Sequence, residues 1–329
     1  MQTKKLLNDK FFTTFLILGF ALALFWGKGF VTGVSRGLNL WATTVVPALL
    51  PYAFLSALLI NKSVPLTLAN KIHKGFYKLF SVGKGTAFAF FINLISGCPL
   101  GLKNVADLKN KGLIGDSESV RACILCFTPS PMYLFAIGAL TFGHRRLGVA
   151  LILANLFSVL ITALFFSLFG QKSKQPQRPL SIPLPQPRCQ DAFFESLFSC
   201  AQTMVSLGVS LALFSALVDA LLYTNALLPF SLAFGKVLGS QPLANAFCVG
   251  LIESTWGINL LAKASHPLSF ALSGVVSGFG GLSTLIQTAV ILKGAKIKTA
   301  PIYLAKVMQA ILNFLLCLAF ARCSFLLDF

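Results

Sequence analysis

Charged residues are scarce in this chain of 329 residues, of which they make up only 11%. Soluble domains carry about 25% charged residues, so this chain has less than half the usual share and too few charged side chains to cover a water-facing surface. This shortage excludes soluble globular, disordered and collagen-like proteins. Hydrophobic residues, by contrast, make up 56% of the sequence. We therefore expect an all-α polytopic membrane protein whose main partner is the lipid bilayer.

Histidine is rarer still, with three residues in the chain, and the patterns of catalytic and metal centres are missing. His73, His144 and His266 fall in predicted loops, and no H-E-x-x-H sequence occurs. Cys123 and Cys126 form a C-x-x-C pair without a second pair or a suitably spaced histidine. We expect no enzyme activity, no metal and no cofactor. A coupling ion, either a proton or sodium, is not identified by the sequence.

Acidic residues number nine against 27 basic ones, which gives a formal net charge of +18. In a soluble protein this excess would indicate nucleic acid, but the cations here are spread along the chain without a soluble domain to present them. In membrane proteins the excess sets topology, because cytoplasmic loops are enriched in Lys and Arg. The basic segment 1–10 therefore places the N-terminus in the cytoplasm, and the apolar segment 11–26, which lacks a cleavage site, is an uncleaved first span.

Apolar runs of about 17–25 residues predict membrane segments. Nine occur, at 11–26, 38–60, 86–102, 122–142, 147–170, 200–222, 244–262, 267–292 and 301–321. The segments 86–102 and 244–262 are short and contain polar residues. If 86–102 spans, the first half of the chain has ten cations on each side of the membrane. If it enters and returns on one side, sixteen lie inside and four outside, which the positive-inside rule favours.

The same reasoning makes 244–262 a second re-entrant hairpin, entered from outside. Seven spans and two hairpins result, with the C-terminus opposite the cytoplasm. After one extra N-terminal span, the order span, hairpin, span, span occurs twice, and three spans per unit make the repeats inverted, as in many transporters. The predicted divisions are an N-terminal span at 1–37, a first repeat at 38–170, a proline-rich cytoplasmic linker at 171–192 and a second repeat at 193–329.

The connection 61–85 has the pattern of an amphipathic helix. One helical face collects apolar side chains and the opposite face collects lysines: Leu68, Ile72, Phe76, Leu79 and Phe80 against Lys71, Lys74 and Lys78. Such a helix lies on an anionic membrane surface. A connector anchored to lipid is favoured over a regulatory or partner-binding role.

Two of the predicted spans are interrupted near their centres. The segment 122–142 contains Thr128, Ser130 and two prolines that free the carbonyls of Leu125 and Phe127, and 267–292 contains Gly278 and Gly280. Broken helices at membrane depth occur where they line a cavity or are buried in protein. Matched interruptions in two repeats favour a transporter site, with ordinary kinks and glycine packing as the alternative.

The tips of both hairpins are predicted to face these interruptions with helix N-termini, which attract anions. Pro99 suits the first turn of a returning helix, and Gly97 and Gly101 serve either close approach to a substrate or packing. The candidate substrate-binding residues are Ser96, Gly97, Pro99, Gly101, Lys103, Thr128, Ser130, Glu253, Ser254, Thr255, Gly278, Gly280 and Lys306.

Three charged residues within these segments have alternative roles. A carboxylate at Glu253 is costly to bury alone, so it carries a proton, binds a cation, accepts a substrate hydroxyl or makes a structural hydrogen bond. Lys306 either extends to the cytoplasmic surface or balances the charge of an anionic substrate. The same two interpretations apply to Lys103.

In these motifs the sequence resembles the YlbJ-type sporulation integral membrane proteins, which are related to nucleoside-recognition or gate domains. The resemblance covers nearly the whole chain in order and is carried by residues 40–51, Ser96–Gly101 with Lys103, Phe127–Pro131, 202–215, Gly250–Glu253 with Gly257, Gly278–Gly281 and Ala305–Lys306. It implies movement of dipicolinic acid, a small anion, across a membrane during endospore formation. A nucleoside-type permease and a non-transporting scaffold of a sporulation complex are the alternatives; protein partners are not identified.

Overall fold

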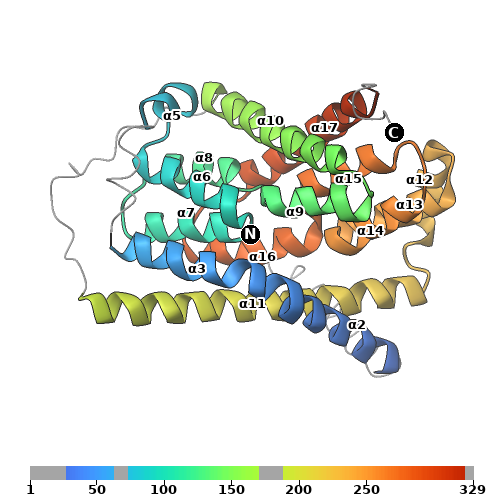
Figure 1. The fold of residues 1–329 in the computed structure, drawn as a ribbon, viewed down its shortest axis with the longest axis horizontal. Helices are drawn as coiled ribbons and strands as arrows, with labels where there is room; N and C mark the ends of the chain where they lie inside the picture. The colour runs from blue at the N-terminus through green and yellow to red at the C-terminus, as the bar shows by residue number, and fades with distance from the viewer. Residues whose placement is uncertain (1–26, 63–72, 170–187, 323–329) are drawn as a thin grey trace, which may run out of the picture.

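The computed structural model describes residues 27–62, 73–169 and 188–322, and this part of the chain consists of helices joined by turns (Figure 1). The helices of its first half are α2 (Gly27–Leu40), the π-helical η1 (Trp41–Val45), α3 (Val46–Asn61), α5 (His73–Phe80), α6 (Lys84–Ser96), α7 (Leu100–Asn110), α8 (Asp116–Leu125), α9 (Pro131–Ala136), the π-helical η3 (Ile137–Thr141) and α10 (Arg145–Phe169). The second half has α11 (Cys189–Tyr223), α12 (Leu228–Leu238), α13 (Gln241–Ile252), α14 (Ser254–Lys263), α15 (Ser269–Phe279), α16 (Gly281–Gly294) and α17 (Ala300–Arg322).

Several helices are long and apolar enough to cross a membrane. Four pass by length and composition, namely α10, α11, α17 and the pair α15–α16, and a fifth is counted if α5 and α6, which meet at 94°, form one broken span. These helices correspond to the predicted segments 147–170, 200–222, 267–292 and 301–321, with differences of one or two residues at residue 170, which is outside the described residues, and at 267–268, which precede α15. A helical, multi-pass membrane protein is thereby confirmed, with four or five such spans in the described residues instead of the seven predicted for the whole chain.

Other predicted segments and boundaries differ from the structure. Segment 122–142 is two helices, because the chain leaves the helical path between Leu125 and Pro131, where prolines lack the N–H group that a helix needs. The last residues of the predicted linker belong to α11, which begins at Cys189. The boundary at residue 37 falls inside α2. Segment 11–26 and most of the linker lie outside the described residues.

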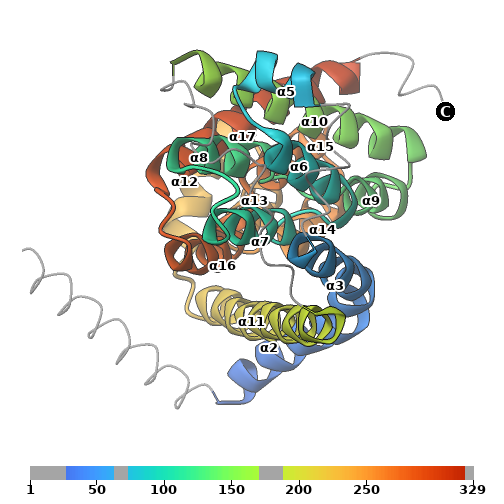
Figure 2. The ribbon, with the colours of Figure 1, turned by 90° about the vertical axis from the view of Figure 1, so that its left-hand side faces the viewer.

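The two halves of the chain meet in a close helix pair. Through η1, helices α2 and α3 form one continuous path that lies beside α11 (Figures 1 and 2). Residues four apart on each side make the contact, with Gly33, Gly37 and Trp41 facing Ala216, Ala212 and Gly208 in that order. Rising numbers on one side face falling numbers on the other, so the pair is antiparallel. A Cβ atom on Gly33 or Gly37 would lie only 2.6 Å from the opposite backbone, which explains the small residues.

Between this pair and the outer helices α10 and α17 lie the shorter helices (Figure 2). α6 and α7 fold back on each other, because Gly85 near the start of α6 lies against Leu108 at the far end of α7 and against Ile114 in the turn that follows it. At the turn between them, Gly101 packs on Asn93. α13 and α14 likewise pack closely, through the backbones of Gly250 and Gly257. Both predicted hairpin segments therefore consist of two short helices with a break between them.

The predicted amphipathic helix at 61–85 is described from residue 73 onward, where it forms α5. Phe76 packs on Phe80 and on Phe90 of α6, with ring centres 5.7 and 5.5 Å apart. Phe80 is buried, whereas Leu79 and Lys78 are exposed. This helix therefore turns its phenylalanines to the protein. Leu68, Lys71 and Ile72 lie outside the described residues.

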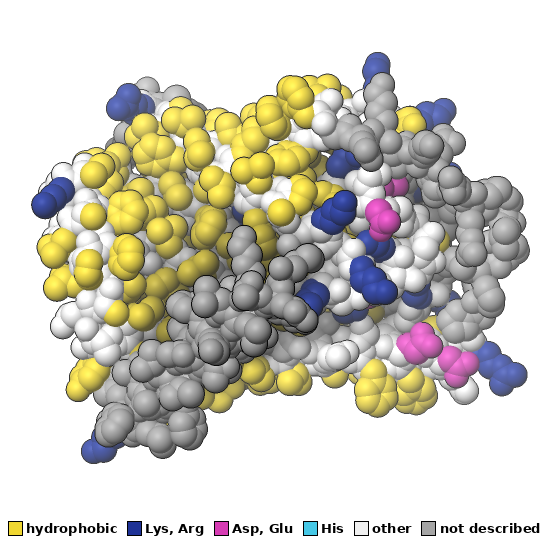
Figure 3. Space-filling model, turned by 180° about the vertical axis from the view of Figure 1, so that it is seen from behind, with side chains coloured by type: hydrophobic (Ala, Val, Ile, Leu, Met, Phe, Trp, Pro, Cys, Tyr) yellow, Lys and Arg dark blue, Asp and Glu magenta, His cyan; other side chains and the backbone are white. Residues whose placement is uncertain are grey.

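Cations that the sequence places on one side of the membrane gather at one end of the bundle. Lys109 Nζ lies 2.8 Å from Asp116 Oδ1 and 2.9 Å from the carbonyl oxygen of Lys296, and Lys111 Nζ donates to Asn61 Oδ1. The ends of α3, α7 and α16 therefore meet the start of α8. Figure 3 shows Lys and Arg side chains clustered toward one end of the face in view, while hydrophobic side chains dominate the other end.

Candidate functional site

Four breaks in the helices form the core of the candidate site. The chain turns after α6 at Gly97, whose φ of +71° is left-handed, and α7 begins after Pro99. α9 begins after Ser130, whose hydroxyl caps the new helix, and α14 begins after Glu253. Gly280, with a φ of +90°, separates α15 from α16. Each break starts a helix and therefore leaves N–H groups at its first turn without partners inside the helix.

The breaks lie against each other in pairs within each half of the chain. In the first half, Cys98 N donates to the carbonyl oxygen of Thr128 at 2.9 Å. In the second half, the Gly281 backbone approaches Ser254 so closely that an added Cβ would lie 3.2 Å from its nitrogen. The tip of each short-helix hairpin thus contacts the interruption that follows it in the chain.

A cavity of about 660 Å³ lies between these breaks on one side and the helices α2, α3 and α11 on the other. Its volume is within the range of small-molecule sites. The side toward α3 and α11 is mainly apolar and includes Tyr52 and Leu211. Eight of the thirteen candidate residues line the cavity, namely Ser96, Pro99, Ser130, Glu253, Ser254, Thr255, Gly280 and Lys306.

The electrostatic character of this cavity favours an anion. Its lining includes the N-cap residue of α7 and first-turn residues of α9, α14 and α16, and α9 continues through η3 to Thr141. The positive ends of four helix dipoles therefore meet at one space, and that of α14 is offset by the carboxylate of Glu253. Lys306 adds an ammonium group, whereas Glu253 is the one acidic side chain among the described lining residues.

Lys306 is the most buried charged side chain of the site, with 1% of its surface exposed. Its Nζ donates to the carbonyl oxygen of Phe127 at 2.8 Å and to Gln309 Oε1 at 2.9 Å, and it lies 4.5 Å from the centre of the Phe127 ring. The ammonium group therefore stays inside the protein and does not extend to a membrane surface. An ammonium group has three donors, so one N–H remains for a ligand in the cavity.

The Phe127 carbonyl is one of the two that the prolines were expected to free. Its use by Lys306 explains how a broken helix is tolerated here, since the last helix supplies the missing donor. Gln309 Nε2 similarly donates to the carbonyl oxygen of Ile124 at 3.2 Å. α17 thus completes the backbone hydrogen bonding around the break between α8 and α9.

A chain of buried polar side chains connects Lys306 on α17 with the neighbouring helices α10 and α15. Asn313 Nδ2 donates to the Gln309 carbonyl oxygen at 3.1 Å and to Ser158 Oγ at 2.9 Å. Asn155 Nδ2 contacts Ser277 Oγ at 3.3 Å, and Ser277 lines the cavity. These contacts connect α10, α15 and α17 and fix the helix that carries Lys306.

Glu253 caps α14 with both carboxylate oxygens. Oε1 accepts from Thr255 N at 3.0 Å and Oε2 from Trp256 N at 2.7 Å. Of the alternatives drawn from the sequence, this geometry agrees best with the structural hydrogen bond. Among the described lining residues Glu253 is the acidic one. Its hydrogen bonds to two backbone N–H groups and its place at the positive end of the α14 dipole offset part of its negative charge within the cavity.

The other five candidate residues do not line the cavity. Gly97 lies against Ser130, Gly101 packs on Asn93, and Gly278 packs against α17. The Thr128 carbonyl holds the first hairpin tip. For the glycines, close packing is the role that the structure shows.

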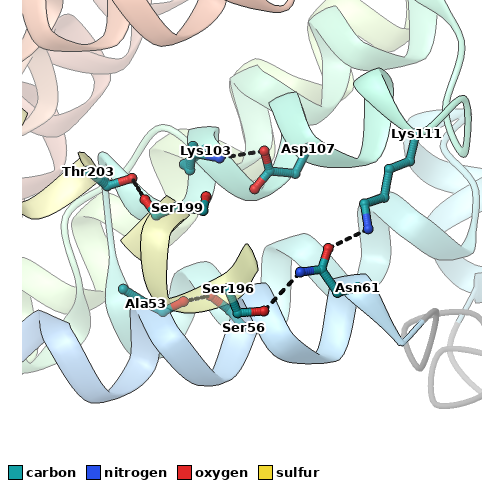
Figure 4. Close-up of polar contacts among 9 residues, drawn as sticks. All are labelled: Ala53, Ser56, Asn61, Lys103, Asp107, Lys111, Ser196, Ser199 and Thr203. Carbon is teal, nitrogen blue, oxygen red and sulfur yellow. Dashed lines mark hydrogen bonds and ion pairs between the residues drawn. The ribbon is translucent and has the colours of Figure 1, made fainter. Parts of the chain in front are cut away.

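Lys103 also points away from the cavity. Figure 4 shows it turned toward Asp107 on α7, at 2.5 Å, on a polar stretch that faces α3 and α11. Further along, Lys111 contacts Asn61 of α3, whose amide donates to Ser196 Oγ of α11 at 2.9 Å. These residues connect the two layers of helices at one end of the bundle.

Several lining residues were missed from the sequence because they lie in apolar runs without a motif. Tyr133, whose hydroxyl contacts Thr255 Oγ1 at 3.4 Å, is one, and Ser283, Thr284 and Gln287 on one side of α16 are others. Gly280, Thr284 and Gln287 are separated by four and then three residues, which places them on one face of a helix. This spacing is the signal that could have found them. In the residues that the structure describes, no group of three His, Cys, Asp or Glu side chains is placed to hold a metal ion.

The chain is similar in sequence to a known membrane protein. The chain is 25% identical over 304 residues to the sporulation integral membrane protein YlbJ of Bacillus subtilis strain 168, which covers 84% of this chain and 74% of that protein. The resemblance to YlbJ-type proteins that the motifs indicated is thereby confirmed. No family model matches the sequence, and no solved structure gives a significant match.

Proposed function

From its similarity to a sporulation integral membrane protein and the chemistry of its cavity, we propose that this protein transports a small organic anion, dipicolinate, across a membrane during endospore formation. The observation that carries the proposal is the convergence of Lys306 and the N-termini of α7, α9 and α16 on one cavity whose only described acidic side chain, Glu253, is tied up as the cap of α14. The protein acts as a carrier or facilitator and not as an enzyme.

The lining residues suit a flat aromatic dicarboxylate. One carboxylate accepts the remaining N–H of Lys306, and the other accepts from hydroxyl groups at the starts of α14 and α16 and from backbone N–H groups at the start of α16. The rings of Phe127 and Tyr133 and the apolar wall of α3 and α11 contact the faces of the substrate ring. A nucleoside carries no formal charge, so it could accept a hydrogen bond from the ammonium group but would not gain the attraction between opposite charges.

The transport mechanism follows from an inverted repeat. The order of a long helix, a short helix, two pairs of short helices and a second long helix occurs at 27–169 and again at 189–322. The antiparallel contact between α2–α3 and α11, which occupy equivalent places in this order, supports an inverted relation. In this arrangement α6–α7 and α13–α14 are re-entrant hairpins from opposite sides, and the cavity between them opens alternately to each side.

The positive-inside rule gives the orientation. The end of the bundle with Lys109, Lys111 and Lys296 faces the cytoplasm together with the N-terminus, and the C-terminus lies on the opposite side. Dipicolinate entering from the cytoplasm would pass this basic end first.

Flux into liposomes tests the proposal. Purified protein is reconstituted and uptake of radiolabelled dipicolinate is measured with an excess of unlabelled dipicolinate, benzoate or nucleoside outside. We expect uptake above that of empty liposomes, competition by dipicolinate and none by nucleosides. Competition by nucleosides instead would establish the permease alternative, and wild-type protein without any flux would favour a scaffold and refute transport.

A further inference from the structure

A second cavity, of about 890 Å³, lies at the ends of α7, α8, α16 and α17. It shares no lining residue with the central cavity. Five of its described lining residues are ionisable, four of them basic and one acidic: Lys109, Arg121, Lys296, Lys298 and Asp116. Four positive charges less one negative charge leave an excess of three positive charges around one space.

Contacts among these elements hold the cations in place. Lys109 Nζ is shared between Asp116 Oδ1 at 2.8 Å and the carbonyl oxygen of Lys296 at 2.9 Å, which fixes the turn between α16 and α17 on the end of α7. Lys296 takes a left-handed conformation with a φ of +53°, and Arg121 is buried, with 5% of its surface exposed. Lys109 and Arg121 are therefore held within the fold, and the exposed Lys296 and Lys298 lie beside them at the same cavity.

Basic groups outnumber acidic ones around this cavity. The hydrogen bond and charge of Lys109, with a further contribution from Lys298, hold the pKa of the Asp116 carboxyl below its ordinary value. Bringing four cations together costs free energy through their mutual repulsion, and the carboxylates of Asp116 and of the buried Glu118, whose charge acts on Arg121, offset only part of it. A bound anion with two negative charges would remove most of the remaining imbalance.

The kinds of donor present fit a phosphate group. Lys296 and Lys298 are exposed, and their ammonium groups are the compact point charges with which lysine binds phosphate, while the buried Arg121 adds its charge to the wall. Apolar side chains, Val120, Ile124 and Phe166, complete the wall. The cavity lies where four helices end, two of them apolar enough to belong to membrane spans. Basic pockets at the ends of membrane helices hold anionic lipid headgroups.

We propose that this basic cavity is a phosphate site, separate from the transport cavity, that holds either the headgroup of an anionic phospholipid or a soluble phosphate ester. The proposal does not depend on the substrate of the central cavity.

Binding to the full-length protein in neutral detergent tests it. The shift in thermal unfolding is measured while phosphatidylglycerol, phosphatidylcholine, glycerol 3-phosphate or inorganic phosphate is titrated at constant ionic strength. The test variant combines Lys296→Gln with Lys298→Gln, both exposed positions. The control combines Lys236→Gln with Lys263→Gln, which removes the same charge at two other exposed lysines that do not line the cavity.

We expect phosphatidylglycerol, but not phosphatidylcholine, to stabilise the wild type, with an apparent affinity that falls about tenfold or more in the test variant and stays unchanged in the control. The same loss for glycerol 3-phosphate or phosphate would support the site with a soluble ligand. Equal losses in both variants would mean general charge attraction, and that result, or no stabilisation by any phosphate compound, would overturn the proposal.

Discussion

Replacement of Lys306 by glutamine is the sharpest test of the transport cavity. The ammonium group gives two hydrogen bonds inside the protein and keeps one N–H for the substrate. A hydrogen bond to a charged group contributes about 1.5–3 kcal/mol, so its loss should lower the affinity for dipicolinate about ten- to 150-fold. The Phe127 carbonyl also loses its partner, which should lower the free energy of unfolding by roughly 1–3 kcal/mol. Equilibrium binding of radiolabelled dipicolinate and thermal unfolding measure the two effects on one preparation.

Two further variants separate charge from folding. Lys306→Arg keeps the charge and should retain more affinity than Lys306→Gln, although its guanidinium does not reproduce the geometry of an ammonium group. Lys263→Gln, at an exposed position near the end of α14, should leave both measurements unchanged. If Lys306→Gln folds and binds dipicolinate as tightly as the wild type, the anion site has been placed on the wrong side chain.

Three other predictions follow from the same geometry. Glu253→Gln retains one of the two acceptor oxygens that cap α14, so unfolding should become easier by about 0.5–2 kcal/mol with dipicolinate affinity unchanged; a large loss of affinity would indicate direct substrate contact. Gly97→Ala and Gly112→Ala share a left-handed φ, +71° and +69°, which costs an alanine roughly 1–2 kcal/mol. Because only the Gly97 Cβ would meet backbone, at 2.5 Å, this variant should be clearly the less stable in thermal unfolding, and equal stability would contradict the close contact. Cys189 should react with an impermeant thiol reagent only from the cytoplasm, and a cysteine introduced by Lys263→Cys only from the other side; labelling of both from one side would exclude the proposed topology.

Local chemistry explains which features of the sequence were informative. Prolines and glycines mark the breaks at Pro99, Pro131 and Gly280, because they act on the backbone of their own neighbourhood. The prediction of a free carbonyl at Phe127 likewise needs only the proline four residues later. The long apolar runs identify α10 and α17, because the length and hydropathy of a membrane helix are properties of its own residues.

Features that depend on distant partners could not be read in this way. The donor to Phe127 is Lys306, 179 residues further along the chain, and a lysine near the start of an apolar run looks the same whether it points inward or toward the surface. The early start of α11 was missed because Asp191 and Glu195 lower the hydropathy of its first turns. Asn155 and Asn313 gave no signal, since single polar residues in apolar helices have no recognisable spacing until the helices pack together.

The hydrogen bonds from α17 to the first half of the chain have a consequence for biosynthesis. The carbonyl groups of Ile124 and Phe127 emerge from the ribosome well before Gln309 and Lys306, which later serve as their donors. Until α17 is inserted, these carbonyls must remain in water or accept an unfavourable place in the lipid, where each unpaired group costs several kcal/mol. The broken segment can therefore reach its final depth only when α17 arrives, so that the central cavity is assembled only after this distant helix has been made.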